Sequence, residues 1–151
     1  MKHPFEIASL LTPLTAFIAL WVGIKQYKIE KNQLKLNLYQ KRYQVYDGIK
    51  NLLIAAIQNG KLNATDLSNF TVDTKEHDFL FDNDIADYIK QIQEKAANWH
   101  ALGFDLHAPG GVPNETRRQE LATKNSELFL WFGNQFDISK GLFKKYLKFD
   151  K

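Results

Sequence analysis

The chain has 151 residues, of which 13% are aromatic and none is cysteine, and its formal net charge is +3. The missing cysteines exclude disulfides, thiolate metal sites and cysteine nucleophiles. A net charge this small does not by itself indicate nucleic-acid binding, and we do not expect nucleic acid as a partner.

The charges are distributed unevenly along the chain. Residues 25–42 contain six Lys or Arg and one Glu, whereas residues 61–87 contain two Lys and seven Asp or Glu. A basic segment and an acidic segment of this kind can pair with each other or with a partner.

The first predicted element is a membrane-spanning helix at residues 7–24. This stretch, IASLLTPLTAFIALWVGI, has eighteen residues and no charge. A helix of that length can cross a hydrocarbon layer of roughly 30 Å. Aromatic and basic side chains lie at the end of this stretch and just after it, where the membrane–water interface would be. The predicted interface residues are Trp21, Lys25, Tyr27, Lys28 and Lys31.

The basic residues that follow this stretch also predict an orientation. The positive-inside rule places residues 25–151 in the cytoplasm and Met1 outside, which corresponds to a single-pass protein of the bacterial inner membrane. Two alternatives stay open. A cleaved signal peptide would need a small-residue cleavage site, whereas the stretch ends in WVGI and is followed by KQYK. A buried core helix would show a polar face, and residues 7–24 show none.

A long helix is expected after the membrane segment. No Pro or Gly interrupts residues 24–47, so we expect a basic, coiled-coil-like stalk. Apolar residues then recur at helical spacing, and Asn59-Gly60 supplies a stop signal. These features divide the chain into an anchor at 1–24, a stalk at 25–44 and a bundle at 45–151.

Two helices are predicted in the first part of the bundle. Thr65 is the expected N-cap of the first, whose apolar face extends to Phe81. Asp82 or Asn83 is expected to cap the second, which Gly103 ends. The second helix carries a regular apolar stripe. Its members are Ile85, Tyr88, Ile89, Ile92, Ala96, Trp99 and Leu102.

Two more helices are predicted after a loop. The Pro and Gly content of HAPGGVP, residues 107–113, is typical of a loop. Asn114 is the expected N-cap of the next helix, and Ser139 is expected to start a short last helix that ends at Leu147. Without any strand-like alternation, the pattern predicts an all-α protein in which a membrane helix and stalk precede a small antiparallel bundle.

An acidic run with one histidine is the strongest candidate for a metal site. Hard cations need several carboxylate oxygens that converge on one point, and the candidate ligands are His77, Asp78, Asp82 and Asp84. The run lacks the glycine and the terminal glutamate of an EF-hand loop. Carboxylates at a helix start are also favoured by the helix dipole, so we expect a structural role and no bound metal or cofactor.

Two aromatic groups are candidate recognition surfaces. Tyr39, Tyr43 and Tyr46 share a helix face, which favours entry into the bundle over stacking on single-stranded nucleic acid. The run at 128–132 is apolar all around a helix, and we predict a partner-binding patch there. Its residues are Leu128, Phe129, Leu130, Trp131 and Phe132.

Two segments resemble a pattern of short bacterial single-pass membrane proteins of unknown function. The segments are KLNLYQKRYQVYDGIKNLL at 35–53 and FLFDNDI at 79–85. In those proteins a membrane helix precedes an aromatic and basic helix and a Phe-Leu-Phe turn. The resemblance implies a bacterial single-pass protein with a helical cytoplasmic domain, and it carries over no site residue.

The expected function is a non-enzymatic interaction or scaffold module of a membrane-associated complex. The expected partners are the lipid bilayer and a protein encoded by a neighbouring gene. Two alternatives remain. One is a metal-dependent hydrolase that uses the acidic cluster between Asp78 and Asp87, and the other is a homo-oligomer or small pore that assembles through the membrane helix and stalk.

Overall fold

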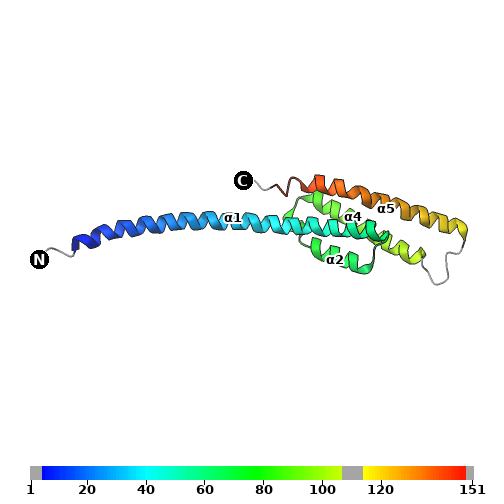
Figure 1. Cartoon of the computed structure of the whole chain (residues 1–151), viewed down its shortest axis with the longest axis horizontal. Helices are drawn as coiled ribbons and strands as arrows, with labels where there is room; N and C mark the ends of the chain where they lie inside the picture. Colours follow the sequence, from blue (N-terminus) through cyan, green and yellow to red (C-terminus); the bar gives the residue numbers. More distant parts are fainter. Residues whose placement is uncertain (1–4, 107–113, 149–151) are drawn as a thin grey trace. The chain divides into compact units, whose positions relative to one another are not determined.

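The computed structural model describes the backbone of residues 5–106 and 114–148 and the side chains of residues 15–105 and 114–148. All regular elements in these ranges are helices, which confirms the all-α prediction (Figure 1). They are α1 (Phe5–Asn59), α2 (Ala64–Thr74), α3 (His77–Leu80), α4 (Asn83–Leu106) and α5 (Glu115–Phe143). The chain divides into two units, Met1–Leu38 and Tyr39–Lys151.

The described residues of the first unit belong to the N-terminal part of α1. Its described side chains, from residue 15 onwards, are exposed, because a single helix has no second element of its own unit to pack against. Within the part of the chain that the structure describes, we find no helix with an apolar stretch long enough to cross a membrane. The side chains of residues 7–14, the first part of the predicted membrane segment, lie outside the described residues.

The second unit begins within α1, which ends where the sequence predicts. Gly60 has a φ of 61°, a left-handed conformation that glycine adopts without steric cost. Its N–H donates to the carbonyl of Ala56 over 3.0 Å, which satisfies one of the last carbonyls of the helix.

The N-terminus of α2 differs from the prediction. Asn63 is the N-cap, not Thr65: its side chain accepts from the N–H of Asp66, and the Asp66 carboxylate accepts from the N–H of Asn63, both over 2.9 Å. This reciprocal pair satisfies two free N–H groups, which a cap at Thr65 would not do. The helix also ends at Thr74 and does not reach Phe81, because the short helix α3 intervenes.

Helix α4 starts at Asn83 as predicted but continues past Gly103 to Leu106. One glycine inside a helix costs only about 1 kcal/mol, and the His100 and Phe104 rings, which lie 4.8 Å apart, span this position. The prediction that Gly103 ends the helix is therefore wrong. The predicted stripe from Ile85 to Leu102 is confirmed, since all seven side chains are buried.

Helix α5 is capped by Asn114, as predicted, whose side chain accepts from the N–H of Arg117 over 2.8 Å. The predicted separate helix from Ser139 to Leu147 is wrong, because α5 continues through Ser139 to Phe143. The buried Ser139 hydroxyl donates to the carbonyl of Phe136 over 3.0 Å. The serine therefore satisfies its polar group inside the helix instead of starting a new one.

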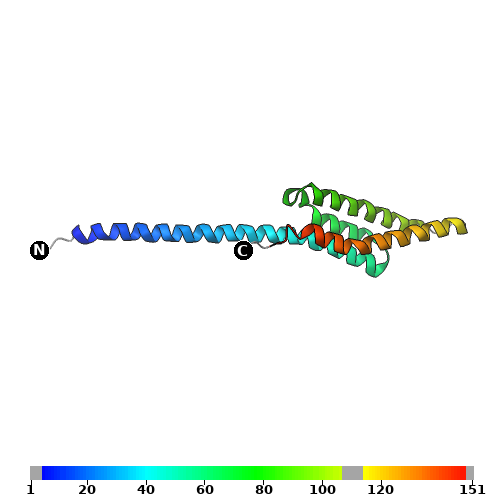
Figure 2. The same ribbon diagram turned by 90° about the horizontal axis from the view of Figure 1, so that it is seen from above.

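Helices α4 and α5 pack side by side in opposite directions (Figures 1 and 2). The Tyr88 hydroxyl lies 3.4 Å from the carbonyl of Gln135, and the Trp99 indole N–H donates to the side chain of Asn125 over 2.7 Å. Residue numbers thus rise along α4 as they fall along α5. The core of the second unit lies between these helices and the end of α1. Its largest fully buried side chains include Trp99, Phe132, Phe143, Ile49, Leu53 and Ile89.

Candidate functional site

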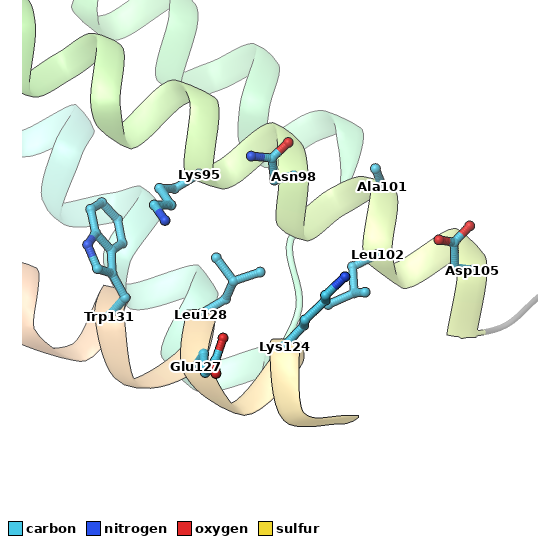
Figure 3. Close-up of a pocket in the computed structure, with 9 residues that line it drawn as sticks. All are labelled: Lys95, Asn98, Ala101, Leu102, Asp105, Lys124, Glu127, Leu128 and Trp131. Carbon is cyan, nitrogen blue, oxygen red and sulfur yellow. The ribbon is translucent and has the colours of Figure 1, made fainter. Parts of the chain in front are cut away.

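A groove between α4 and α5 is the main cavity that we consider as a site, and its volume is about 520 Å³. Figure 3 shows Leu128, Trp131 and Lys124 rising from α5 toward α4. The groove is lined by Lys95, Asn98, Ala101, Leu102, Asp105, Lys124, Glu127, Leu128 and Trp131. A volume of this size is within the usual range of binding pockets, roughly 300–1,000 Å³.

The floor of the groove is apolar and aromatic. Leu102 is buried, and Leu128 and Trp131 are half-buried. The Trp131 ring lies 4.9 Å from the ring of the buried Phe132, and the ammonium of Lys95 lies 5.8 Å above the Trp131 ring. Such a ring offers a large rigid contact area at little entropic cost, which is why Trp is frequent at interface hot spots.

The buried neighbours of the groove fix its geometry. Trp99 packs against Phe132 with 5.0 Å between ring centroids and bonds to Asn125 across the two helices. Because Asn125 and Leu128 are three residues apart on α5, this hydrogen bond also sets the height of Leu128 and Trp131 relative to α4. The groove is thus held by the core and not by surface loops.

The rim of the groove carries charges of both signs. Lys95 and Asp105 come from α4, and Lys124 and Glu127 come from α5. The Asp105 carboxylate lies 3.9 Å from the guanidinium of Arg117. Among the described residues, Lys124 and Glu127 have no ion-pair partner, so both are available to a binding partner.

The predicted partner-binding patch is divided by the fold. Phe132 is fully buried, Leu128 and Trp131 line the groove, and Phe129 and Leu130 are exposed beside it. A helix that is apolar all around has this outcome when one side faces a core and another faces solvent. The role of these five residues in partner binding stays a prediction.

The four residues considered as candidate metal ligands form two separate groups. The Nε2 of His77 lies 3.1 Å from the Asp78 carboxylate, and its Nδ1 lies 2.7 Å from the carbonyl of Thr74. Asp82 and Asp84 instead meet the C-terminal residues Lys145 and Tyr146. Across the described ranges, no three His, Asp or Glu side chains are grouped as metal ligands.

The Asp82–Asp84 group fastens the segment after α5 to the start of α4. The Tyr146 hydroxyl lies 2.7 Å from the Asp82 carboxylate and 2.8 Å from that of Asp84, and the Lys145 ammonium lies 3.0 Å from Asp84. The hydrogen bonds from Lys145 and Tyr146 lower the pKa of Asp84 below its ordinary value. The bond to Tyr146 and the bond to Asp84 raise the pKa of Lys145.

Aromatic packing surrounds this group and includes the predicted tyrosine row. The rings of Tyr39 and Tyr43 stack at 6.2 Å, and Tyr46 packs on Phe143 at 5.2 Å. Arg42 donates to the carbonyl of Leu80 over 3.0 Å and lies 5.5 Å from the Tyr146 ring. Tyr46 and Arg42 are therefore engaged in packing, as the prediction of a bundle entry point requires.

The predicted membrane-interface residues all belong to the first unit and are exposed. They are Trp21, Lys25, Tyr27, Lys28 and Lys31. The Lys25 ammonium lies 5.5 Å above the Trp21 ring. Whether they lie at a lipid surface stays a prediction.

The groove residues on α4 were not predicted from the sequence. Lys95, Asn98 and Asp105 flank the predicted apolar stripe, and their spacing is that of an ordinary solvated face. Only the way in which α5 packs on α4 makes them one side of a groove. No protein-family model, no curated protein and no solved structure matches the chain.

Proposed function

We propose that this chain is a non-enzymatic, membrane-tethered interaction module of the bacterial inner membrane whose α4–α5 groove binds a protein partner. The observation that carries the proposal is the groove itself: an apolar floor formed by Leu102, Leu128 and Trp131, with charged side chains around it. An apolar centre inside a polar rim is the usual anatomy of a protein interface.

The shape of the groove favours a helical partner. It lies between two packed antiparallel helices, a geometry into which an amphipathic helix can insert its apolar residues at i, i+3, i+4 and i+7. Lys124 and Glu127 would then pair with opposite charges on the partner, and Trp131 would be covered at the centre of the contact.

The tether is supported by residues 7–24 and by the basic residues that follow. The described side chains in this stretch include Phe17, Ile18 and Leu20, all of them exposed. Exposed apolar side chains in such a row are stable in lipid and unfavourable in water. The resemblance to bacterial single-pass proteins is consistent with this proposal.

The groove is tested by cross-linking in cells that express the full-length chain. A photo-reactive residue replaces Ala101, which lines the groove, or Ile138, an exposed side chain elsewhere on the second unit. We expect a defined protein adduct from position 101 and none from position 138.

Charge reversal at the rim decides whether that adduct reflects the groove. Lys124→Glu removes a cation that has no partner among the described residues, so folding is preserved, and we expect the adduct to fall at least several-fold. Lys90→Glu, an exposed position on α4 outside the groove, is the matched control. Equal adduct yields from Lys124→Glu and Lys90→Glu would contradict binding of the partner in the groove.

A further inference from the structure

The first unit carries a seven-residue repeat along one face of α1. Its apolar positions alternate at spacings of three and four residues, and all are exposed; Leu34, for example, is 70% exposed. They are Phe17, Leu20, Ile24, Tyr27, Leu34 and Leu38. Lys31 occupies the remaining position. This spacing is that of the a and d positions of a coiled coil, with Phe17, Ile24, Lys31 and Leu38 at a.

A second face of the same helix has a weaker pattern. Val22, Ile29 and Leu36 recur every seven residues, but Gln26 and Gln33 occupy the alternating positions. A seam in which two of five positions are glutamine buries less apolar area than one with six apolar positions in seven. The Phe17–Leu38 face is therefore the better site for a second helix.

From this seam we infer that two copies of the chain associate through α1 as a parallel, in-register, two-stranded coiled coil from Phe17 to Leu38. The flanking charges identify the occupant as a second copy and fix its direction. Lys28 and Lys35 take e positions and Glu30 takes a g position, and in a parallel pair Glu30 of one copy meets Lys35 of the other. In an antiparallel pair the e positions face each other, and the lysines repel.

The polar residue within the seam has a role of its own. A single Lys at an a position lowers the stability of a coiled coil but favours one register and a two-stranded state. Lys31 is this position, and the charges of Glu30, Lys31 and Lys35 have no ion-pair partner in the part of the chain that the structure describes. All three are free to act between copies.

Dimerisation has a consequence for binding. Two copies present two α4–α5 grooves, so that a partner with two binding segments gains affinity from the higher effective concentration of the second groove. The dimer does not depend on the groove. Its seam shares Phe17, Leu20 and Ile24 with the proposed tether, but Leu34 and Leu38 lie beyond residues 7–24, so the dimer can be tested at these two positions separately from the proposed function.

Single-cysteine cross-linking of the full chain in mild detergent tests the seam, because the natural sequence has no cysteine. Ile24→Cys, Leu34→Cys and Leu38→Cys each place two cysteines opposite each other in a parallel dimer, close to the Cα separation of about 4.4–6.8 Å that a disulfide needs. Leu36→Cys is the matched control: the same substitution two residues from Leu34, on the other face.

We expect all three seam variants to give disulfide-linked dimers on oxidation, with a yield at least fivefold above that of Leu36→Cys. Equal yields, or no dimer from the seam positions, would overturn the coiled coil. Cross-linking at only one of the three positions would indicate an antiparallel pair and would overturn the parallel arrangement.

A charge exchange tests the register. Glu30→Lys in the Leu34→Cys chain puts two lysines opposite each other, and the dimer yield should fall. Adding Lys35→Glu restores an opposite pair, and the yield should recover. A double variant whose dimer yield stays as low as that of the single variant would contradict the contact between Glu30 and Lys35 across the two copies.

Discussion

At the residue scale, Gly48 of α1 packs closely against Asp73 of α2. A Cβ atom built on Gly48 would lie 2.5 Å from the Cβ of Asp73, which is too close for two carbon atoms. The Asp73 Cβ is attached directly to the backbone, so it cannot rotate away. Glycine is required here by the packing of two helices and not by an unusual backbone conformation.

We therefore expect Gly48→Ala to destabilise the second unit, although alanine normally favours a helix by about 1 kcal/mol over glycine. Overpacking of this kind costs about 1–3 kcal/mol, so the net effect on the free energy of unfolding should be a loss of up to about 2 kcal/mol. Gly141→Ala, where a Cβ meets no atom within 4 Å, should raise Tm. Thermal unfolding of both variants checks this, and a rise in Tm for Gly48→Ala would contradict the close packing.

Asp84 should give the second unit a specific sensitivity to acid. Its pKa is lowered in the folded chain by hydrogen bonds from Lys145 and Tyr146. A lowered folded-state pKa means that the carboxylate contributes stability above its unfolded pKa of about 4, and that this contribution is lost as the pH falls through the folded value. Because the group is exposed, the contribution is modest.

We expect Asp84→Asn to unfold at a lower Tm than the wild type at pH 7 and to lose less of its Tm between pH 5 and pH 2. The measurement is Tm against pH for both chains. Asp87→Asn, an exposed carboxylate one turn further along α4, serves as the comparison. Identical pH dependence in the two variants would show that the bonds to Lys145 and Tyr146 do not affect stability.

At the element scale, the sequence predicted most clearly those features that depend on local chemistry. The stop at Asn59-Gly60, the Asn114 cap and the stripe from Ile85 to Leu102 all follow from neighbouring residues. The N-cap of α2 was predicted at Thr65 and not at Asn63. A local signal for Asn63 was nevertheless present, because Asp66 lies three residues after it, which is the spacing of a capping box.

The α2 cap can be checked by removal. Asn63→Ala loses the hydrogen bond to the N–H of Asp66, and such a loss costs about 0.5–2 kcal/mol. Thr65→Ala, at the position that the sequence suggested, should leave the free energy of unfolding nearly unchanged. Chemical unfolding of both variants measures the difference. A larger loss in the free energy of unfolding from Thr65→Ala than from Asn63→Ala would contradict the cap at Asn63.

The groove lay beyond sequence analysis for a physical reason. Leu128 and Trp131 were identified as candidates from their apolar run, but their partners Lys95, Asn98 and Asp105 lie more than twenty residues earlier in the chain. What joins the two sets is the register of α5 on α4, which non-local contacts such as Trp99 to Asn125 determine. Periodicity within one helix carries no information about that register.

At the scale of the whole molecule, the two units differ in what holds them together. The unit from Tyr39 to Lys151 has a buried core, whereas the described residues of the unit from Met1 to Leu38 form one helix, whose described apolar side chains are exposed. An isolated helix draws most of its stability from packing against something else. We propose that lipid supplies this packing around residues 7–24 and that a second copy supplies it along the seam.

The central claim, the membrane tether, is tested most directly by alkaline extraction of membranes from cells that make the full-length chain. We expect the wild type to stay in the membrane pellet. Ile18→Lys with Ala19→Lys should release it, since both positions lie well inside the predicted segment 7–24 and each Lys costs roughly 2.5–3.5 kcal/mol near the centre of an inserting helix. Ile29→Lys with Leu36→Lys adds the same charge further along α1 and should leave the chain in the pellet. A wild-type chain that is recovered in the supernatant would contradict the tether.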